Sequence, residues 1–504
     1  MGYLHEDLIG ENWMKRFLSL LLSVLMVVSL LSGCGQQTPT VDVSVDGTTP
    51  VNFDESNIVL QFGAISDLHL GRGGSGINTV LWIKDAYKTL RDIAAQYSKK
   101  GLNAVLVSGD LTDNGTTAQV EEFAQIYETV FDPKEVPLIF TLGNHDVHVG
   151  SGSYNYGDLT FEITYNSLGE KYRGYESDSR LDIACVHQIV NGYHFLAINP
   201  LDEGYRNTLG NSVLYAEATK AWLDEMLAKI TAKDPDQYVF ISTHPLIYGT
   251  AYGSEHTYTT TGWFTRELTE ILSKYPQAMT FGGHVHFPIN SDLSIMQTTF
   301  TALQCGSVNY MSVEDGEYRD MNTAVSLTDR EKIHNGYLVQ VDKEGNVRVL
   351  RLNFAYKQEM KYPFVLRAPQ EDGSHLLDYS WDRGSSAKNE APVLPEDAIS
   401  ITDNAADVLT GGKVTPRLTF KAATDDDQVH AYAVTVRNAK QNIIETQRVL
   451  ADFYKVLQPS DMKTEWTFTL TGKYEKGEVY EIMLVAIDDW GVASNIVKYD
   501  YMPY

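Results

Sequence analysis

Five short motifs place acidic, histidine and asparagine side chains between residues 67 and 286. They are Asp67-Leu68-His69, Gly109-Asp110, Gly143-Asn144-His145-Asp146, His244-Pro245 and His284-Val285-His286. Carboxylate oxygens and imidazole nitrogens bind Mn, Fe and Zn ions, and a carboxylate can bridge two ions because it has two oxygens. Any one of these motifs arises by chance in a chain of this length, but all five in this order, each after a predicted strand, argue against a chance or purely structural origin.

Each motif follows the C-terminal end of a segment that is predicted to be a strand. Short apolar runs predict strands at residues 58–65, 104–107, 138–141, 195–198, 238–241 and 278–281. Amphipathic stretches predict helices at residues 79–99, 118–130, 214–230 and 264–274. This alternation predicts a layered α/β domain with a largely buried sheet. In such sheets the loops at the carboxyl edge form the binding crevice, so motifs far apart in sequence can meet there.

In this order and at these strand ends, the motifs resemble those of the calcineurin-like metallophosphoesterase superfamily. The resemblance extends from residue 58 to about residue 364, where a predicted β-hairpin at 337–352 closes the domain. The sequence around the first two motifs is similar to the branch that contains bacterial cyclic-nucleotide and glycerophosphodiester phosphodiesterases. The resemblance implies that residues 57–366 fold as a layered metallophosphoesterase β-sandwich core flanked by helices.

The resemblance also implies a binuclear centre for two divalent or trivalent metal ions, Mn, Fe or Zn. Its implied ligands are Asp67, His69 and His286 for one ion, Asn144, His244 and His284 for the second ion, and Asp110 as the bridge. His145 is then the candidate general acid and Asp146 its orienting partner, with a helix N-cap as the alternative role of Asp146. Purple acid phosphatases of the same superfamily carry a tyrosine three residues after the bridging aspartate. This chain has Asp113 there, so we expect no iron–tyrosinate colour.

The expected function is that of an exported phosphoesterase, which hydrolyses a phosphodiester by attack of a metal-bound hydroxide with His145 as general acid. Two divalent ions, two carboxylates and a hydroxide leave the pocket positively charged, which suits the single negative charge of a diester. Two alternatives stay open. The first is a phosphomonoesterase or pyrophosphatase that acts on extracellular nucleotides, because one such core serves all three substrate classes. The second is a surface binding protein with a non-catalytic core.

The composition excludes several classes of protein and partner. The 504 residues include 40 Lys and Arg against 66 Asp and Glu, for a formal net charge of −26, and 43% of them are hydrophobic. These proportions exclude a disordered chain, a collagen and a polytopic membrane protein. The negative charge disfavours binding to a nucleic-acid duplex. Of the three cysteines no two stand at the spacing of a zinc site, and whether Cys185 and Cys305 pair stays open.

The N-terminal region predicts export and a lipid anchor. Lys15 and Arg16 precede an apolar stretch at residues 17–31, whose 15 residues are fewer than the ~20 that a membrane-spanning helix needs. The stretch ends in Leu31-Ser32-Gly33-Cys34, which resembles the lipobox of bacterial lipoproteins, where cleavage leaves a lipidated cysteine. The alternative is a buried apolar helix of a cytosolic protein.

We therefore expect a signal peptide at residues 1–33 and a lipidated tether at residues 34–56. Translation is expected to start at Met14, because the preceding residues carry three acidic side chains that do not suit a signal peptide. The expected location is the outer face of the cytoplasmic membrane of a bacterium, with that membrane as a partner through Cys34.

A second domain is predicted after a linker at residues 367–396, which contains Gly-Ser and Pro-rich stretches. Alternating runs predict strands alone at residues 417–422, 431–437, 442–450, 465–470 and 480–487. We expect residues 397–504 to form a smaller all-β domain that resembles immunoglobulin or fibronectin modules. Its expected role is to contact a glycan or another protein, and the oligomeric state stays open.

Several residues outside the motifs have two interpretations. Arg72 either meets a phosphate oxygen or is an ordinary surface arginine. The acidic runs at 425–427 and 488–489 either bind calcium or occupy turns between strands. The segment at 151–180 is either a lid or a surface loop. Four histidines are expected to be surface or hydrogen-bonded residues rather than ligands: His148, His187, His194 and His256.

Overall fold

A computed structural model of the chain describes residues 51–72, 76–147, 174–200, 212–255, 264–314, 324–326, 332–370, 372–403 and 415–504. The predicted signal peptide, Met14, Cys34, the tether up to residue 50, His148, His256 and most of the segment at 151–180 lie outside these residues. Residues Thr49–Tyr504 form one compact unit. Within the described ranges, no helix has both the length and the apolar character needed to cross a membrane.

The first layer of the fold is a seven-stranded sheet. Its strands are β1 (Ile58–Ile65), β2 (Ala104–Ser108), β3 (Leu138–Thr141), β14 (Asn335–Asp342), β15 (Val347–Asn353), β16 (Gln358–Glu359) and β17 (Phe364–Leu366). The order is β16-β15-β14-β1-β2-β3, and β17 also pairs with β15. Strands β1, β2 and β3 are parallel, whereas the predicted hairpin of β14 and β15 joins the sheet antiparallel to β1.

The second layer is a six-stranded sheet with the order β10-β11-β9-β6-β5-β4. Its strands are β4 (Cys185–Val190), β5 (Tyr193–Ile198), β6 (Val239–Ser242), β9 (Ala278–Gly282), β10 (Ile295–Gln297) and β11 (Thr301–Gln304). The central strands β5, β6, β9 and β11 are parallel. The two cysteines of the core, Cys185 and Cys305, are both buried and free.

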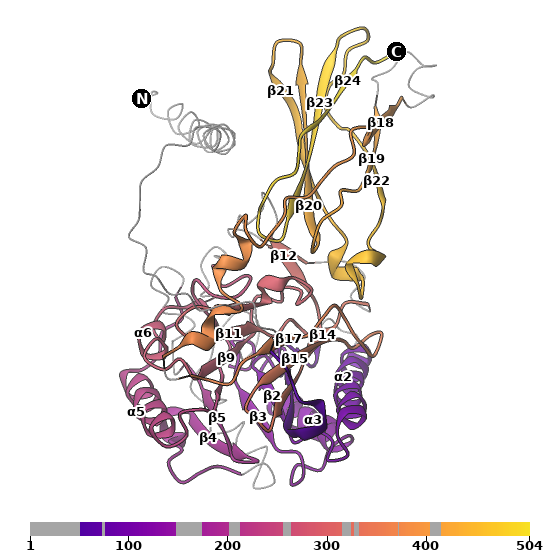
Figure 1. The fold of residues 1–504 in the computed structure, drawn as a ribbon. Coiled ribbons are helices and arrows are strands. Elements are labelled where there is room, and N and C mark those ends of the chain that lie inside the picture. The colour runs from indigo at the N-terminus through magenta and orange to yellow at the C-terminus, as the bar shows by residue number, and fades with distance from the viewer. Residues whose placement is uncertain are drawn as a thin grey trace, which may run out of the picture. The chain divides into compact units, whose positions relative to one another are not determined.

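The strands of the two sheets lie side by side in the lower part of Figure 1, and aromatic side chains join the two sheets. The ring of Phe62 on β1 lies 5.0 Å from that of Phe195, 4.8 Å from that of Phe240 and 5.7 Å from that of Phe281, which come from β5, β6 and β9. All four side chains are completely buried. The predicted β-sandwich core is therefore confirmed.

Helices cover the outer faces of both sheets. Helix α2 (Gly76–Tyr97) packs on β1 and β14 of the first sheet, α3 (Thr117–Glu128) packs against α2, and α5 (Glu217–Lys233) packs on β5 and β6 of the second sheet. Helix α3 begins where the Thr116 side chain accepts a hydrogen bond from the Gln119 amide, which satisfies a free helix N–H. Its buried residues recur every three or four positions, as expected for a helix with one face in the core.

One predicted helix is largely wrong. Residues 264–274 contain only the short helix α6 (Thr269–Leu272), because Phe264–Thr265 form the strand β8, which pairs with β7 (Leu246–Ile247). The backbone groups of β8 bond to neighbouring segments: the Val213 amide donates to the Phe264 carbonyl and the Tyr248 amide donates to the Thr265 carbonyl. These pairings satisfy the backbone of two buried residues, so the helical pattern does not extend there.

In the described residues from 399 to 504, all paired strands run antiparallel to each other. One sheet has the order β18 (Ile399–Thr402), β19 (Arg417–Lys421) and β22 (Glu465–Thr469), and the other has β21 (Ile443–Leu450), β20 (Val429–Asn438), β23 (Tyr480–Asp488) and β24 (Val497–Tyr501). Buried apolar residues of both sheets belong to one core. The prediction of an all-β region is confirmed, whereas the domain boundaries at 366 and 397 and the likeness to immunoglobulin modules stay predictions.

The contact between the two main sheets predicts the cost of truncating Phe62. We expect Phe62→Ala to lower the free energy of unfolding by about 3–5 kcal/mol, because it leaves a cavity among three other rings. Urea unfolding of the protein measures this change. The control is Leu81→Ala at a residue that is 53% exposed, which should cost less than about 0.5 kcal/mol. Equal effects of the two substitutions would contradict the observed packing.

Candidate metal centre

The motif residues lie just beyond the carboxyl ends of parallel strands from both sheets. Asp67 and Asp110 come two residues after β1 and β2, His244 comes two residues after β6, and His284 comes two residues after β9. Because the two sheets face each other, their carboxyl edges contribute to the same site. The structure brings together all seven side chains that the resemblance implies as ligands.

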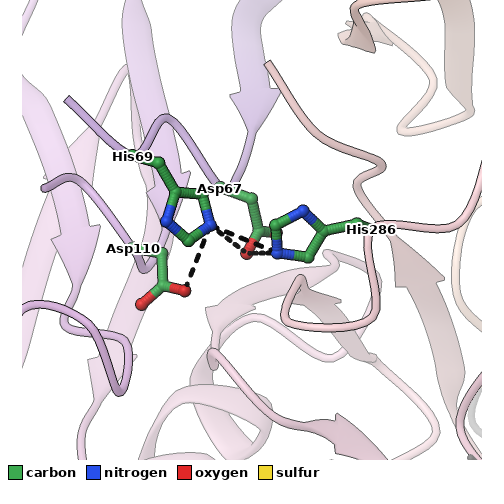
Figure 2. A group of neighbouring side chains, drawn as sticks. All are labelled: Asp67, His69, Asp110 and His286. Atoms are coloured by element: carbon green, nitrogen blue, oxygen red, sulfur yellow. Dashed lines mark hydrogen bonds and ion pairs between the residues drawn. The ribbon is translucent and has the colours of Figure 1, made fainter. Parts of the chain in front are cut away.

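The first group of side chains comprises Asp67, His69, Asp110 and His286 (Figure 2). His286 Nε2 lies 3.1 Å from Asp67 Oδ1, and His69 Nε2 lies 3.8 Å from the same oxygen. His69 Nε2 also lies 3.5 Å from Asp110 Oδ2 and 3.2 Å from His286 Nε2. All four residues are almost completely buried.

The second group comprises Asp110, His244 and His284, with Asn144 beside them. His244 Nε2 lies 3.5 Å from Asp110 Oδ2, 3.1 Å from His284 Nδ1 and 3.2 Å from Asn144 Oδ1. Asp110 Oδ2 is thus at the same distance from His69 and His244, one residue of each group. A carboxylate shared by two ligand groups is the arrangement that a bridging ligand requires.

The hydrogen bonds of the imidazoles fit metal binding. His244 Nδ1 faces the Ser108 carbonyl at 2.7 Å and His286 Nδ1 faces the Tyr310 carbonyl at 2.9 Å, so in each ring Nδ1 is the donor. A metal ion would displace any proton on Nε2, and the lone pair of Nε2 would then point toward Asp110 Oδ2 in His244 and toward Asp67 Oδ1 in His286. Lone pairs that converge in a buried site repel one another unless a cation lies between them, so the donor set fits metal ions.

The electrostatics of the site also favour a cation. Burial lowers the pKa of His69 to about 4, so this imidazole is neutral at pH 7 and can offer a lone pair. Although burial opposes ionisation of Asp110, the neighbouring His244 and His145 hold its pKa well below the usual value. Conversely, Asp110 raises the pKa of His244 to about 9 against the effect of burial. The point between these side chains therefore favours a positive charge.

The backbone of the site is strained. Five implied ligands have positive φ angles outside the usual range of non-glycine residues: Asp67 at 56°, His69 at 44°, Asp110 at 50°, His284 at 72° and His286 at 58°. Such conformations cost about 1–3 kcal/mol each and persist where the surrounding structure enforces them, most often at functional sites. The coincidence of strain with the implied ligands supports their common function.

Two motif positions, 109 and 143, require glycine because other site residues lie too close for a Cβ atom. A Cβ atom on Gly109 would lie 2.3 Å from His244 Nδ1, and one on Gly143 would lie 2.0 Å from Asp110 Oδ1. Gly109 also has a φ of 87°, which a larger residue adopts only at a cost. The glycines before Asp110 and Asn144 therefore let the ligand loops pack against each other.

His145 and Asp146 occupy different environments. The side chain of His145 is 29% exposed at the rim of the site, and its Nδ1 lies 3.0 Å from the Asp113 carbonyl oxygen. Asp146 is buried and accepts hydrogen bonds from the amides of Leu111, Thr112 and Gly143. Asp146 thus ties two motif loops together, and these contacts favour Asp113 over Asp146 as the residue that orients His145.

Sequence reasoning did not identify Asp113 and Tyr310 as residues of the site, and it left the role of Arg72 open. Asp113 Oδ1 lies 3.3 Å from His69 Nδ1 and accepts a hydrogen bond from Arg72 Nη1 at 3.0 Å. The guanidinium of Arg72 lies over the Tyr310 ring, 4.2 Å from its centroid, and Tyr310 in turn packs on His286. Asp113 could have been found from its position three residues after Asp110, whereas no pattern marks Tyr310.

The other described histidines have partners outside the site. His187 bonds through its two ring nitrogens to Asp178 at 2.6 Å and to His194 at 2.8 Å, and His194 lies near Asp234. These contacts agree with the expectation that His187 and His194 are hydrogen-bonded residues rather than ligands.

One family model matches the part of the chain that carries the five motifs. The model of the calcineurin-like phosphoesterase family matches residues 60–288. No curated protein matches the sequence. A purple acid phosphatase from yellow lupin (Lupinus luteus) seeds is 17% identical with a TM-score of 0.40, over 62% of this chain and 55% of that structure. A protein of Staphylococcus aureus assigned as a 5′-nucleotidase is 14% identical with a TM-score of 0.33, over 63% of this chain and 57% of that structure. The chain thus spans little more than half the length of either structure.

The shared position of Asp110 predicts that its removal affects both ions. We expect the protein to bind about two Mn²⁺ ions per chain and Asp110→Ala to bind fewer than about one, because both groups lose a ligand. Metal analysis after equilibrium dialysis measures the stoichiometry. Asp178→Asn is the control, because Asp178 bonds to His187 outside the site. If Asp110→Ala retained two ions, Asp110 would not be the bridge.

Proposed function

Because residues 60–288 are a calcineurin-like phosphoesterase domain, we propose that the protein is a metal-dependent phosphoesterase that hydrolyses phosphodiesters. The observation that carries the proposal is the pair of buried ligand groups that share Asp110. Their seven side chains would hold two divalent ions. When bound, such ions activate water and stabilise the charge of a phosphoryl group during in-line displacement.

His145 is the proposed general acid for the leaving alkoxide. It is more exposed than any of the carboxylates and imidazoles of the two ligand groups, so a bound ester can reach it. Its Nδ1 faces the Asp113 carbonyl, so Nδ1 is the donor of that hydrogen bond. In the charged ring Nε2 then holds the proton that can be transferred.

The charges at the rim support a substrate with a single negative charge. Arg72 lies beside Asp113, is about one third exposed, and its guanidinium is paired with that carboxylate. Because Asp113 neutralises Arg72, this pair adds no net charge to the small positive excess of two bound ions. A phosphodiester carries one negative charge, whereas a phosphomonoester carries close to two at neutral pH. This balance favours the diester over the monoester or pyrophosphate.

We also propose that the protein acts outside the cytoplasm as a lipoprotein anchored through Cys34. The support is the sequence alone: the basic and apolar segment before Leu31-Ser32-Gly33-Cys34. Such a location would give the enzyme access to phosphate esters at the cell surface.

A matched pair of substrates tests the proposed reaction. We expect bis(nitrophenyl) phosphate to be hydrolysed with a kcat/KM on the order of tenfold above that of nitrophenyl phosphate, which corresponds to about 1.4 kcal/mol at the transition state. Absorbance at the nitrophenolate band measures both rates on the same Mn²⁺-loaded protein. Preference for the monoester would favour the nucleotidase alternative. Two bound ions with neither ester cleaved would favour a non-catalytic binding protein.

The role of His145 predicts a dependence on the leaving group. His145→Ala should lower kcat by roughly 10²–10⁴-fold for an alkyl diester, whose alkoxide must be protonated, and far less for a nitrophenyl ester. Steady-state rates with the two esters measure this difference. The control is His194→Ala, which changes a histidine hydrogen-bonded to His187 away from the site. An equal loss for both leaving groups would refute the general-acid role.

A further inference from the structure

The carboxylate of Glu314 connects the phosphoesterase core to the C-terminal strands. Glu314 is completely buried at the end of the short strand β12 (Ser312–Glu314). Its Oε1 lies 2.7 Å from His430 Nε2 and accepts a hydrogen bond from Arg448 Nη2 at 2.7 Å, and its Oε2 accepts one from the Tyr252 hydroxyl. His430 belongs to β20 and Arg448 to β21, and both residues come more than 110 positions after Glu314 in the chain.

The charges of this network are balanced. His430 Nδ1 lies 3.0 Å from Asp489 Oδ1, so both ring nitrogens of His430 face carboxylates. Burial favours the neutral form of both side chains, but their opposite charges outweigh this effect. Glu314 raises the pKa of His430 to about 9, and His430 lowers the pKa of Glu314 to about 2. At neutral pH the two cations, His430 and Arg448, thus meet the two carboxylates. Removal of one charge would leave another buried and unpaired, which is costly.

The segment that ends at Glu314 is bound directly to the metal-ligand loop. The Ser312 amide donates to the His286 carbonyl at 2.9 Å, and His286 Nδ1 donates to the Tyr310 carbonyl at 2.9 Å. The ring of Tyr310 also lies 4.1 Å from that of His286. Any displacement of Glu314 along this strand would therefore move the groups that fix the orientation of His286.

The opposite face of the same loop is covered by the same network. Val285 and Phe287 alternate with the two motif histidines and pack in one apolar cluster with Tyr252, while Trp490 of the C-terminal region packs against that cluster. The rings of Tyr252 and Phe287 are 4.8 Å apart. Tyr252 thus contacts both the ligand loop and the Glu314 carboxylate.

The strained backbone of the loop explains why it needs this support. His284 and His286 have φ angles of 72° and 58°, which non-glycine residues keep only where neighbouring structure enforces them. The contacts of Ser312, Tyr252 and Trp490 supply that enforcement from both sides of the loop.

We propose that Glu314 and His430 are positioning residues of the metal centre, which hold the His284–His286 loop in its ligand-binding conformation. The C-terminal strands are then part of the support of the site rather than an independent attachment. The inference rests on the proposed function for its catalytic consequence, but its effect on metal binding can be measured without any substrate.

The test compares metal affinity in Glu314→Gln with that of the unchanged protein. The substitution keeps the shape of the side chain and removes its charge. We expect the dissociation constant for Mn²⁺ to rise by about 10–100-fold, as for other residues that orient ligands. We also expect kcat to fall with little change in KM. Calorimetric titration of the metal-free protein with Mn²⁺ measures the affinity, and circular dichroism checks that the fold is retained.

Two further variants separate positioning from general destabilisation. Glu445→Gln is the matched control, because Glu445 accepts hydrogen bonds from Tyr474 and from the Thr471 and Gly472 amides within the C-terminal strands. It should lower stability without changing Mn²⁺ affinity. Tyr252→Phe removes only the hydroxyl that bonds to Glu314, and should weaken Mn²⁺ binding in the same direction. If Glu314→Gln does not fold, the Mn²⁺ affinity of Tyr252→Phe tests the role of Glu314 instead.

Unchanged Mn²⁺ affinity in Glu314→Gln and Tyr252→Phe would overturn the proposal, as would an equal loss of affinity in Glu445→Gln. Failure of the proposed function gives a different result. In that case the unchanged protein binds Mn²⁺ but cleaves no phosphate ester, while the affinities of the variants still decide the role of Glu314.

Discussion

The site depends on one buried carboxylate that serves two groups of imidazoles. Asp110 is 1% exposed, and an ionised group at that depth is tolerated only when opposite charge surrounds it. His69 comes from the loop after β1 and His244 from the loop after β6, so Asp110 joins ligands from both sheets. The face-to-face packing of the sheets and the absence of a Cβ at Gly109 and Gly143 both allow this meeting.

Much of the fold and of the ligand set could be predicted from the sequence. Apolar runs such as that of β1 are bounded by motifs with distinctive residue types, so both the strand and its functional end are visible in local sequence. The alternation of strands and helices then requires the motifs to lie at one edge. The prediction of a helix at 264–274 was largely wrong, because the carbonyls of Phe264 and Thr265 accept hydrogen bonds from segments that no local pattern identifies.

The partners of the supporting residues could not be predicted, because they are distant in the chain. Asp113 binds Arg72 across 41 positions, and Glu314 binds His430 across 116 positions. In the sequence each is one acidic residue among 66, and only the tertiary structure pairs it with a cation. For the same reason the two roles expected for Asp146, partner of His145 or helix N-cap, do not include its hydrogen bonds to the backbone amides of Leu111 and Thr112.

Anomalous diffraction from crystals of the Mn²⁺-loaded protein would show whether two ions share Asp110. We expect two peaks of anomalous density, one bounded by Asp67, His69 and His286 and the other by Asn144, His244 and His284. Asp110 should lie between them and contact both. A single peak at saturating Mn²⁺, or peaks away from these side chains, would show that Asp110 does not bridge two ions.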